Sequence, residues 1–282
     1  MILFKKSSDI TNYLQRNSKS GFRIGFVPTM GALHQGHISL IDISKKANSF
    51  TVCSIFVNPT QFNDAKDFDN YPSTIEKDID ALEKAGCDIL FLPSVLEMYP
   101  NGTQNALSYD LGYLETVLEG KYRPGHFQGV CLVVHRLLNI IPAHQLYLGQ
   151  KDYQQCMVIK KLVEIEKIKT TINICPTLRE NSGLAMSSRN MRLSDKDKKL
   201  ALILFETLSY LKKNIKPGEL SELKQTAIYN LINAGFKVDY IEIADAGNLD
   251  IIEHWDGNRK LVAVAAAFLG EVRLIDNLLL SA

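Results

Sequence analysis

The fold is first indicated by Phe26-Val-Pro-Thr-Met-Gly-Ala-Leu-His-Gln-Gly-His37, where an apolar run meets a helical pattern. We interpret this stretch as a strand, a tight turn and a helix, with Gly31 and Gly36 allowing the turn. The unpaired N–H groups and the positive dipole end of a helix favour an anion, most simply a nucleotide phosphate. His34 and His37 would stand at the same helix start and can donate to phosphoryl oxygens. An isolated H-x-G-H is more simply a glycine turn with two solvated histidines, so the choice depends on the remaining sequence.

Length and composition indicate a globular protein with room for one large domain or two ordinary ones. The chain has 282 residues, of which 46% are hydrophobic and 22% charged. Its formal net charge of +1 gives no basic footprint for a long nucleic acid partner. The N-terminus lacks a signal-peptide layout, and the apolar run 261–269 is too short to span a bilayer, so we expect a cytoplasmic protein without membrane partners.

The five cysteines lie inside apolar stretches and show no C-x-x-C spacing. This pattern favours reduced core residues over a zinc site or a disulfide framework. They are Cys53, Cys87, Cys131, Cys156 and Cys175.

Short apolar runs alternate with amphipathic segments up to about residue 175, which predicts a Rossmann-like α/β domain: a parallel sheet with helices on both faces. The expected strands are 22–27, 50–57, 88–92, 145–148 and 171–174. The expected helices are 37–47, 74–85, 127–141 and 152–166, the second with a Ser73-x-x-Glu76 capping box and Gly86 after its end. Ligands in such folds bind beyond the carboxyl ends of the strands.

The pattern changes near Pro176, where two helices are followed by three strands. The helices are expected at 195–214, opening with Ser194-x-x-Asp197, and from Pro217 to about 234. The strands are expected at 237–244, 261–268 and 272–275. We therefore expect a first domain over 1–175 and a smaller C-terminal α+β domain over 176–282.

Polar residues follow the strand expected at 50–57, in the loop Asn58-Pro-Thr-Gln61. The amide of Gln61 has both donors and an acceptor, which suits a ligand with hydroxyl and carboxylate groups, although turn chemistry is the simpler interpretation of the loop alone. The nearby carboxylates are interpreted as a solvated loop and helix face rather than as metal ligands. One of them could still hold Mg²⁺ through water, and the sequence does not choose which. They are Asp64, Asp67, Asp69 and Asp78.

Three further stretches suit phosphate binding, each with an ordinary structural alternative. Gly149-Gln-Lys-Asp152 follows a predicted strand, and Lys151 offers a compact cation with Asp152 and Gln155 on the same helix face. The stretch Met186-Ser-Ser-Arg189 offers two hydroxyls and a guanidinium but would otherwise be a linker. In Arg123-Pro-Gly-His126, the histidine is as well explained by a structural role as by a functional one.

Together these motifs resemble the pantoate–β-alanine ligase family of H-x-G-H nucleotidylyltransferases, in the family's order and over nearly the whole chain. The resemblance implies a Rossmann-like domain with a smaller lid domain, a homodimer and a requirement for Mg²⁺ with ATP. It implies activation of (R)-pantoate as pantoyl adenylate with release of pyrophosphate, followed by transfer of the pantoyl group to β-alanine with release of AMP.

The resemblance also implies roles for individual residues. His37 would be the proton donor, with His34, Lys151 and Arg189 as the other catalytic side chains. Gln61 would contact pantoate and β-alanine, and Gln155 would contact pantoate. ATP would be bound by Met30, Gly31, Ala32, Leu33, His34, Gln35, Gly36, His37, Gly149, Gln150, Lys151, Asp152, Leu178, Met186, Ser187, Ser188 and Arg189.

The chain departs from the family pattern at four positions. Leu178 stands where valine is commoner, and Ser73 replaces an arginine. Cys131 and His135 replace small or polar residues. These changes affect the surroundings of the expected site rather than the activity.

Three other functions are compatible with parts of the pattern. A nucleotidylyltransferase acting on a phosphorylated acceptor would share the H-x-G-H motif, but the neutral Gln61 and Gln155 do not suit a second phosphate. An aminoacyl-tRNA synthetase relative would need a basic tRNA surface, which the formal net charge of +1 does not indicate. A non-catalytic ATP sensor would be expected to lose the cationic side chains, which are present here.

Overall fold

The protein was analysed as a computed structural model, which describes residues 1–18, 22–63, 68–69, 71–103 and 107–280. It divides into two compact units. The first consists of Met1–Gly149 and Val158–Cys175, and the second of Gln150–Met157 and Pro176–Ala282. Residues 150–157, which carry Lys151 and Gln155, thus group with the second unit. The expected boundaries, 1–175 and 176–282, assign these residues to the first domain.

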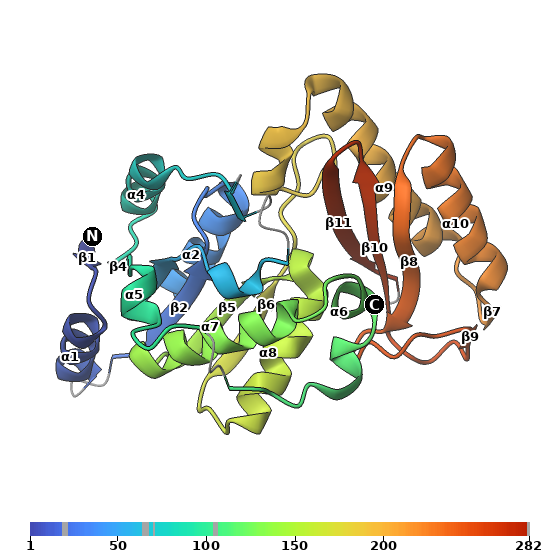
Figure 1. The fold of residues 1–282 in the computed structure, drawn as a ribbon. Coiled ribbons are helices and arrows are strands. Elements are labelled where there is room, and N and C mark those ends of the chain that lie inside the picture. Colours follow the sequence, from blue (N-terminus) through green and yellow to red (C-terminus); the bar gives the residue numbers. More distant parts are fainter. Residues whose placement is uncertain (19–21, 64–67, 70, 104–106, 281–282) are drawn as a thin grey trace. The chain divides into compact units, whose positions relative to one another are not determined.

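The first unit is built on a six-stranded sheet in the order β1-β4-β3-β2-β5-β6 (Figure 1). All of its strand pairs are parallel. The predicted parallel sheet with helices on both faces is confirmed. Side chains of successive strand residues point to opposite faces of a sheet, and the neighbours Phe26 and Val27 are both fully buried. The strands are β1 (Ile2–Phe4), β2 (Ile24–Thr29), β3 (Phe50–Ile55), β4 (Ile89–Phe91), β5 (Gln145–Gly149) and β6 (Thr171–Cys175).

Helices alternate with these strands, and the four that the sequence predicts there, α2, α4, α7 and α8, agree with the expected bounds to within two residues. The helices are α1 (Ser7–Ser18), α2 (Gln35–Ala47), α4 (Ile75–Lys84), α5 (Val95–Met98), α6 (Leu118–Tyr122), α7 (His126–Ile140) and α8 (Tyr153–Ile165). The described residues also form 3₁₀ turns, η1 (Pro59–Gln61) and η2 (Gly112–Glu115) in the first unit and η3 (Gln150–Asp152) and η4 (Ser188–Arg192) in the second.

The second unit is the predicted small α+β domain. Its main sheet has three antiparallel strands in the order β11-β10-β8, and a separate pair joins β7 to β9. Leu204, Leu208 and Leu211 of α9 pack in the same hydrophobic core as Ala263 and Ala265 of β10. The elements are α9 (Asp195–Asn214), β7 (Gly218–Glu219), α10 (Ser221–Asn233), β8 (Lys237–Asp245), β9 (His254–Trp255), β10 (Leu261–Leu269) and β11 (Val272–Leu279).

Two predicted helix starts had opposite outcomes. Ser194 is the N-cap of α9, and its hydroxyl accepts from the N–H of Asp197 at 3.1 Å as predicted. The capping box at Ser73 and Glu76 was wrong, because α4 begins after Thr74, whose side chain makes no cap hydrogen bond. The Thr74 hydroxyl instead donates to Oδ1 of Asp78, four residues further along the chain.

The cysteines are buried and free, as the sequence indicates. Burial raises the pKa of the Cys87 thiol to about 11 and that of Cys131 to about 12. Both thiols therefore stay protonated at neutral pH, which makes them inert core side chains rather than nucleophiles.

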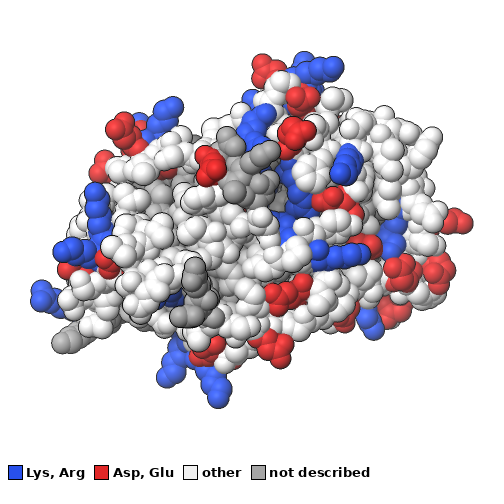
Figure 2. Space-filling model, viewed as in Figure 1, with Lys and Arg blue, Asp and Glu red and all other residues white. Residues whose placement is uncertain are grey.

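The surface carries both signs of charge. On the face in Figure 2, the Lys and Arg side chains of the described residues are interspersed with Asp and Glu. None of the helices in the described part of the chain is long and apolar enough to cross a bilayer.

Candidate functional site

His34 and His37 lie at the junction between β2 and α2, where His34 is the N-cap residue. Nδ1 of His34 accepts from the N–H of Gly36 at 3.1 Å, and Nδ1 of His37 accepts from the N–H of His34 at 3.3 Å. A neutral imidazole that accepts at Nδ1 carries its proton on Nε2. Both half-buried rings can therefore donate from Nε2, and their centroids are 4.1 Å apart.

This arrangement corrects the expected source of anion attraction. The first turn of α2 does not present all of its N–H groups, because Gly36 N–H bonds His34 and His37 N–H bonds the His34 carbonyl at 2.8 Å. Gly36 lies inside the helix rather than in the turn. The helix dipole and the two Nε2–H groups are thus the main anion-directed features here.

The turn before α2 is held by Asp78, a residue of α4. Gly31 and Ala32 have positive φ angles of 83° and 49°, the second of which disfavours a side chain. Asp78 offsets this cost by accepting from the N–H of Ala32 at 2.9 Å and of Leu33 at 2.8 Å. It is 2% exposed, so interpreting it as part of a solvated helix face was wrong. Asp69 is exposed, whereas Asp64 and Asp67 lie outside the described residues.

We expect Asp78→Asn to disturb the histidines through the turn that Asp78 holds. An amide can keep one acceptor but turns an NH₂ group toward a buried N–H, which costs about 1–3 kcal/mol of stability. Because small displacements of reacting groups cost up to roughly 10²-fold in rate, the adenylation that the family resemblance implies should slow by roughly 10- to 100-fold. Urea unfolding and pre-steady-state adenylation would measure the two effects. Asp80→Asn, which changes the exposed partner of Lys84 on the same helix, is the control, and equal rates in both variants would contradict this role.

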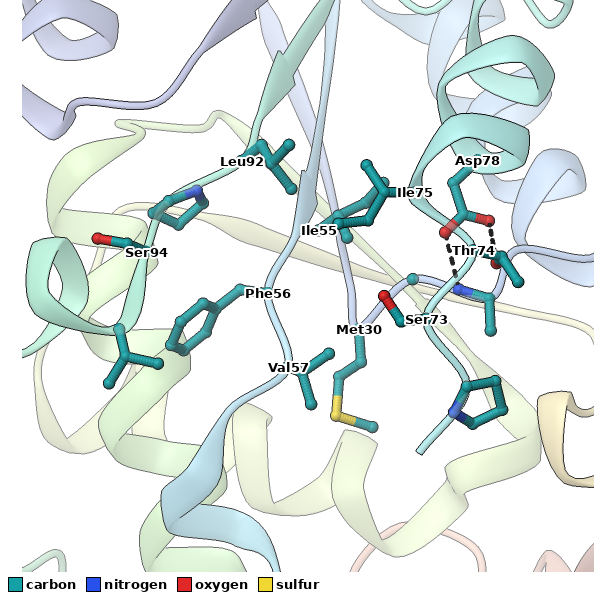
Figure 3. A pocket seen from close by; sticks show the side chains of 15 residues that line it. Met30, Ile55, Phe56, Val57, Ser73, Thr74, Ile75, Asp78, Leu92 and Ser94 are labelled. Atoms are coloured by element: carbon teal, nitrogen blue, oxygen red, sulfur yellow. Dashed lines mark hydrogen bonds between the residues drawn. The ribbon is translucent and has the colours of Figure 1, made fainter. Parts of the chain in front are cut away.

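An apolar cavity of about 240 Å³ opens beside this turn at the carboxyl ends of β2, β3 and β4 (Figure 3). Its walls include Met30, Phe56, Val57 and Leu92, and Ser73 and Asp78 add polar groups to the lining. Met30 also accepts a hydrogen bond at its sulfur from Nε2 of Gln61 at 2.9 Å. The apolar cavity and the amide of Gln61 therefore meet at Met30.

Gln61 ends η1 and is 9% exposed. Its Oε1 accepts from Nδ2 of Asn58 at 3.1 Å, and Asn58 Oδ1 accepts from the Tyr99 hydroxyl at 2.8 Å. Asn58 also caps η1. The polar residues of this loop thus form one buried network that fixes the Gln61 amide.

Helix α7 supports the same turn through its first residues. Nδ1 of His126 donates to the carbonyl of Gln61 at 2.7 Å, and Nε2 accepts from Arg123 at 3.1 Å. His126 is thus placed to position Gln61, and its two ring nitrogens bond protein groups. Of the two interpretations of this histidine, these contacts favour the structural one. Gly129 lies so close to η1 that an added Cβ would be 2.2 Å from the Thr60 carbonyl oxygen.

The Lys151 segment lies in the second unit, directly after Gly149 of the first. An added Cβ on Gly149 would meet nothing within 4 Å, which leaves open space beside the backbone. Nζ of Lys151 lies 3.7 Å from Oδ1 of Asp152, and the two side chains are 16% and 46% exposed. Gln155 is half-buried in the first turns of α8.

The Met186 to Arg189 segment is folded against Leu178 within the second unit. The N–H of Met186 donates to the Leu178 carbonyl at 3.1 Å, next to a bridge that pairs Arg179 with Ala185. The Ser187 hydroxyl caps η4 by accepting from the N–H of Arg189 at 3.2 Å. The structure thus brings Leu178 and Met186 together within the second unit.

The remaining positions that depart from the family pattern are structural in this fold. Cys131 is fully buried in α7, and Nδ1 of His135 lies 2.9 Å from the Tyr109 hydroxyl. Within the described ranges, no group of three His, Cys, Asp or Glu side chains is arranged to hold a metal ion.

Sequence reasoning missed Asp78 and Gly129 as supports of the site. Their partners are Ala32 and Thr60, 46 and 69 residues away. A buried carboxylate among charged helix residues has no local signature, so only the fold reveals it.

A parallel sheet with a histidine pair at the junction between β2 and α2 fits the class of H-x-G-H α/β proteins that the sequence resembles. Comparison with known proteins narrows this class. A family model described as pantoate-beta-alanine ligase matches residues 2–279, and the chain belongs to that family.

Relatives and solved structures agree over the full length. The pantothenate synthetase of Cytophaga hutchinsonii is 44% identical over 99% of both chains. The crystal structure of the pantothenate synthetase of Thermus thermophilus matches with a TM-score of 0.91, at 36% identity and with complete coverage of both chains. A Francisella tularensis pantoate-beta-alanine ligase, solved in complex with beta-gamma ATP and beta-alanine, matches with a TM-score of 0.82 at 40% identity, over 99% of this chain and 97% of that one.

Proposed function

We propose that the protein joins (R)-pantoate to β-alanine in two steps that consume ATP. In the first step, a pantoate carboxylate oxygen attacks the α-phosphorus and the bond to pyrophosphate breaks. In the second, the neutral amine of β-alanine attacks the acyl carbon, AMP leaves and the amine loses a proton. Family membership over residues 2–279 is the single observation that carries this proposal, and the paired histidines support it.

The proposed ATP contacts are residues 30–37 and 149 of the first unit and residues 150–152, 178 and 186–189 of the second. Charge builds on the departing pyrophosphate during adenylation, so fixed donors have most of the work to do. His37 and His34 donate from Nε2, while Lys151 and Arg189 supply positive charge. The inert thiols of the core agree with a reaction that needs no covalent enzyme nucleophile.

The proposed acid-binding residues are Gln61 and Gln155. Gln61 is fixed by Asn58 and its amide adjoins Met30, so a branched hydroxy acid can place a hydroxyl on the amide and methyl groups on the sulfur side chain. Gln61 would then also face β-alanine once the acid is activated. Holding both reactants in one orientation supplies much of the rate of such a condensation.

Mg²⁺ fits this site as a companion of ATP rather than as a resident metal. The described residues offer no three-ligand cage, and Mg²⁺ commonly binds through substrate phosphates with one or two carboxylates and waters. Asp152, half exposed beside Lys151, is a carboxylate that we propose approaches the ion. The ion would neutralise phosphate charge. A cytoplasmic homodimer is proposed from the resemblance to the family.

Exchange of labelled pyrophosphate into ATP tests the adenylate directly. Reversal of the first step requires pantoate and does not require β-alanine. Exchange that depends on pantoate supports the proposal, whereas exchange that depends on a phosphorylated acceptor would assign a different substrate to the same fold. Tight ATP binding with no exchange for any acid would favour a sensor.

We expect Lys151→Ala to weaken the use of ATP more than the reaction of preformed pantoyl adenylate with β-alanine. The triphosphate is present only in the first step, so the cation has most to stabilise there. Separate assays of the two half-reactions would measure the difference, with the exposed Lys84→Ala as control. Equal losses in both half-reactions would contradict a role specific to ATP.

A further inference from the structure

Two consecutive polar residues, Asp276 and Asn277, are buried in β11, where they are 5% and 3% exposed. β11 is an edge strand of the three-stranded sheet and pairs only with β10 among the described strands of that sheet. An unpaired strand edge needs partners for its polar groups. Each of the two side chains holds a different segment of the second unit.

Asn277 holds the turn that carries Lys151. Its Nδ2 donates to the carbonyl of Gln150 at 2.9 Å and to that of Lys151 at 2.8 Å. Its Oδ1 accepts from Nε2 of Gln150 at 3.1 Å, which fixes the orientation of the amide. The Tyr153 hydroxyl adds a second tether by donating to the Ala246 carbonyl at 2.7 Å. These contacts explain why residues 150–157 group with the second unit.

Asp276 holds the segment that leads to Met186 and Arg189. Its carboxylate accepts two bonds from Arg179, at 2.6 and 2.9 Å, and Arg179 also donates to the Gly183 carbonyl at 3.2 Å. The guanidinium lies 3.9 Å above the Phe205 ring. A bidentate pair held on an aromatic face fixes the direction of Arg179, and with it the adjoining Leu178 to Met186 pairing.

We propose that Asp276 and Asn277 are positioning residues that join the two candidate ATP-binding segments of this unit into one rigid cradle. Asp276 and Asn277 are consecutive residues, so their Cα atoms are about 3.8 Å apart. The two tethers that they make therefore set the spacing between the Lys151 turn and the Leu178 to Arg189 segment. Both side chains act through the segments that they hold. The inference deepens the proposed function and rests on its assignment of ATP to these segments.

Asn277→Asp tests the inference with an isosteric change. A carboxylate cannot donate and would face two carbonyl oxygens, so the Lys151 turn should shift. We expect kcat/KM for ATP in adenylation to fall by roughly 10- to 100-fold, while KM for pantoate changes by less than roughly threefold. The matched control is Asn258→Asp on the exposed loop between β9 and β10. If the aspartate variant does not fold, Asn277→Ser replaces it. This variant keeps one hydroxyl donor, so kcat/KM for ATP should fall by a smaller factor, again with little change in KM for pantoate.

A double-mutant cycle with Lys151→Ala separates the possible results. If Asn277 acts through Lys151, adding Asn277→Asp to Lys151→Ala should cost less than roughly threefold further. Full additivity, or wild-type adenylation by folded Asn277→Asp, would overturn the positioning role while leaving the proposed function intact. Unimpaired adenylation by Lys151→Ala alone would instead reject the assigned ATP contact, and the inference with it.

Discussion

Replacing His37 by alanine will lower the rate of adenylation by roughly 10²- to 10⁴-fold, the range for a positioned general acid or charge-stabilising group. The Nδ1 atom of His37 accepts from the N–H of His34, so the ring is oriented and its Nε2–H is the donor that the substitution removes. Single-turnover formation of pyrophosphate from ATP and pantoate would measure the loss.

The same variant should keep its fold, because His37 is half-buried and its Cβ remains in the first turn of α2. His37→Gln is a useful companion, since its Nε2 can donate from nearly the same place and should recover part of the rate. His144→Ala is a control, because that imidazole accepts from the N–H of Ile24, away from the helix start. Near wild-type turnover by folded His37→Ala would remove this histidine from the mechanism.

Gly129→Ala is expected to have the second large effect. The added Cβ would meet backbone atoms of η1, 2.2 Å from the Thr60 oxygen and 2.8 Å from the Gln61 Cα, so no flexible side chain can move aside. Overpacking of this kind costs about 1–3 kcal/mol of stability. The strain also pushes Gln61 away from Met30, so kcat/KM for pantoate should fall by roughly 10²-fold.

Steady-state kinetics with varied pantoate, together with urea unfolding, would test this expectation. Gly247→Ala is the matched control, because its added Cβ would approach only the side-chain oxygen of Asp245, at 3.1 Å. A folded Gly129→Ala enzyme with wild-type KM and kcat would show that the close contact between α7 and η1 does not position Gln61.

The sequence predicted the parts of this structure that depend on short-range patterns. Buried strands appear as continuous apolar runs, and the histidines at the start of α2 lie within four residues of each other. The Ser194 cap was readable for the same reason. The short strand β1 and the helix α1 were missed, since three residues carry too little pattern and α1 has few apolar positions.

The supports of the site could not be predicted because their partners are remote in sequence. Asp78 resembles the other carboxylates of α4 until the fold places it under Ala32 and Leu33. Asn277 lies 126 residues from Lys151, whose carbonyl it binds. The capping box at Ser73 failed within the local sequence, because α4 begins after Thr74, whose hydroxyl donates to Asp78 four residues further on.

The most direct test of the account is to incubate the purified protein with Mg²⁺, ATP and (R)-pantoate, with and without β-alanine, and to quantify AMP, pyrophosphate and the amide. We expect AMP and the amide to form in equal amounts, and only when pantoate and β-alanine are both present. Pyrophosphate release with another carboxylate or a phosphorylated acceptor, and none with pantoate, would contradict it.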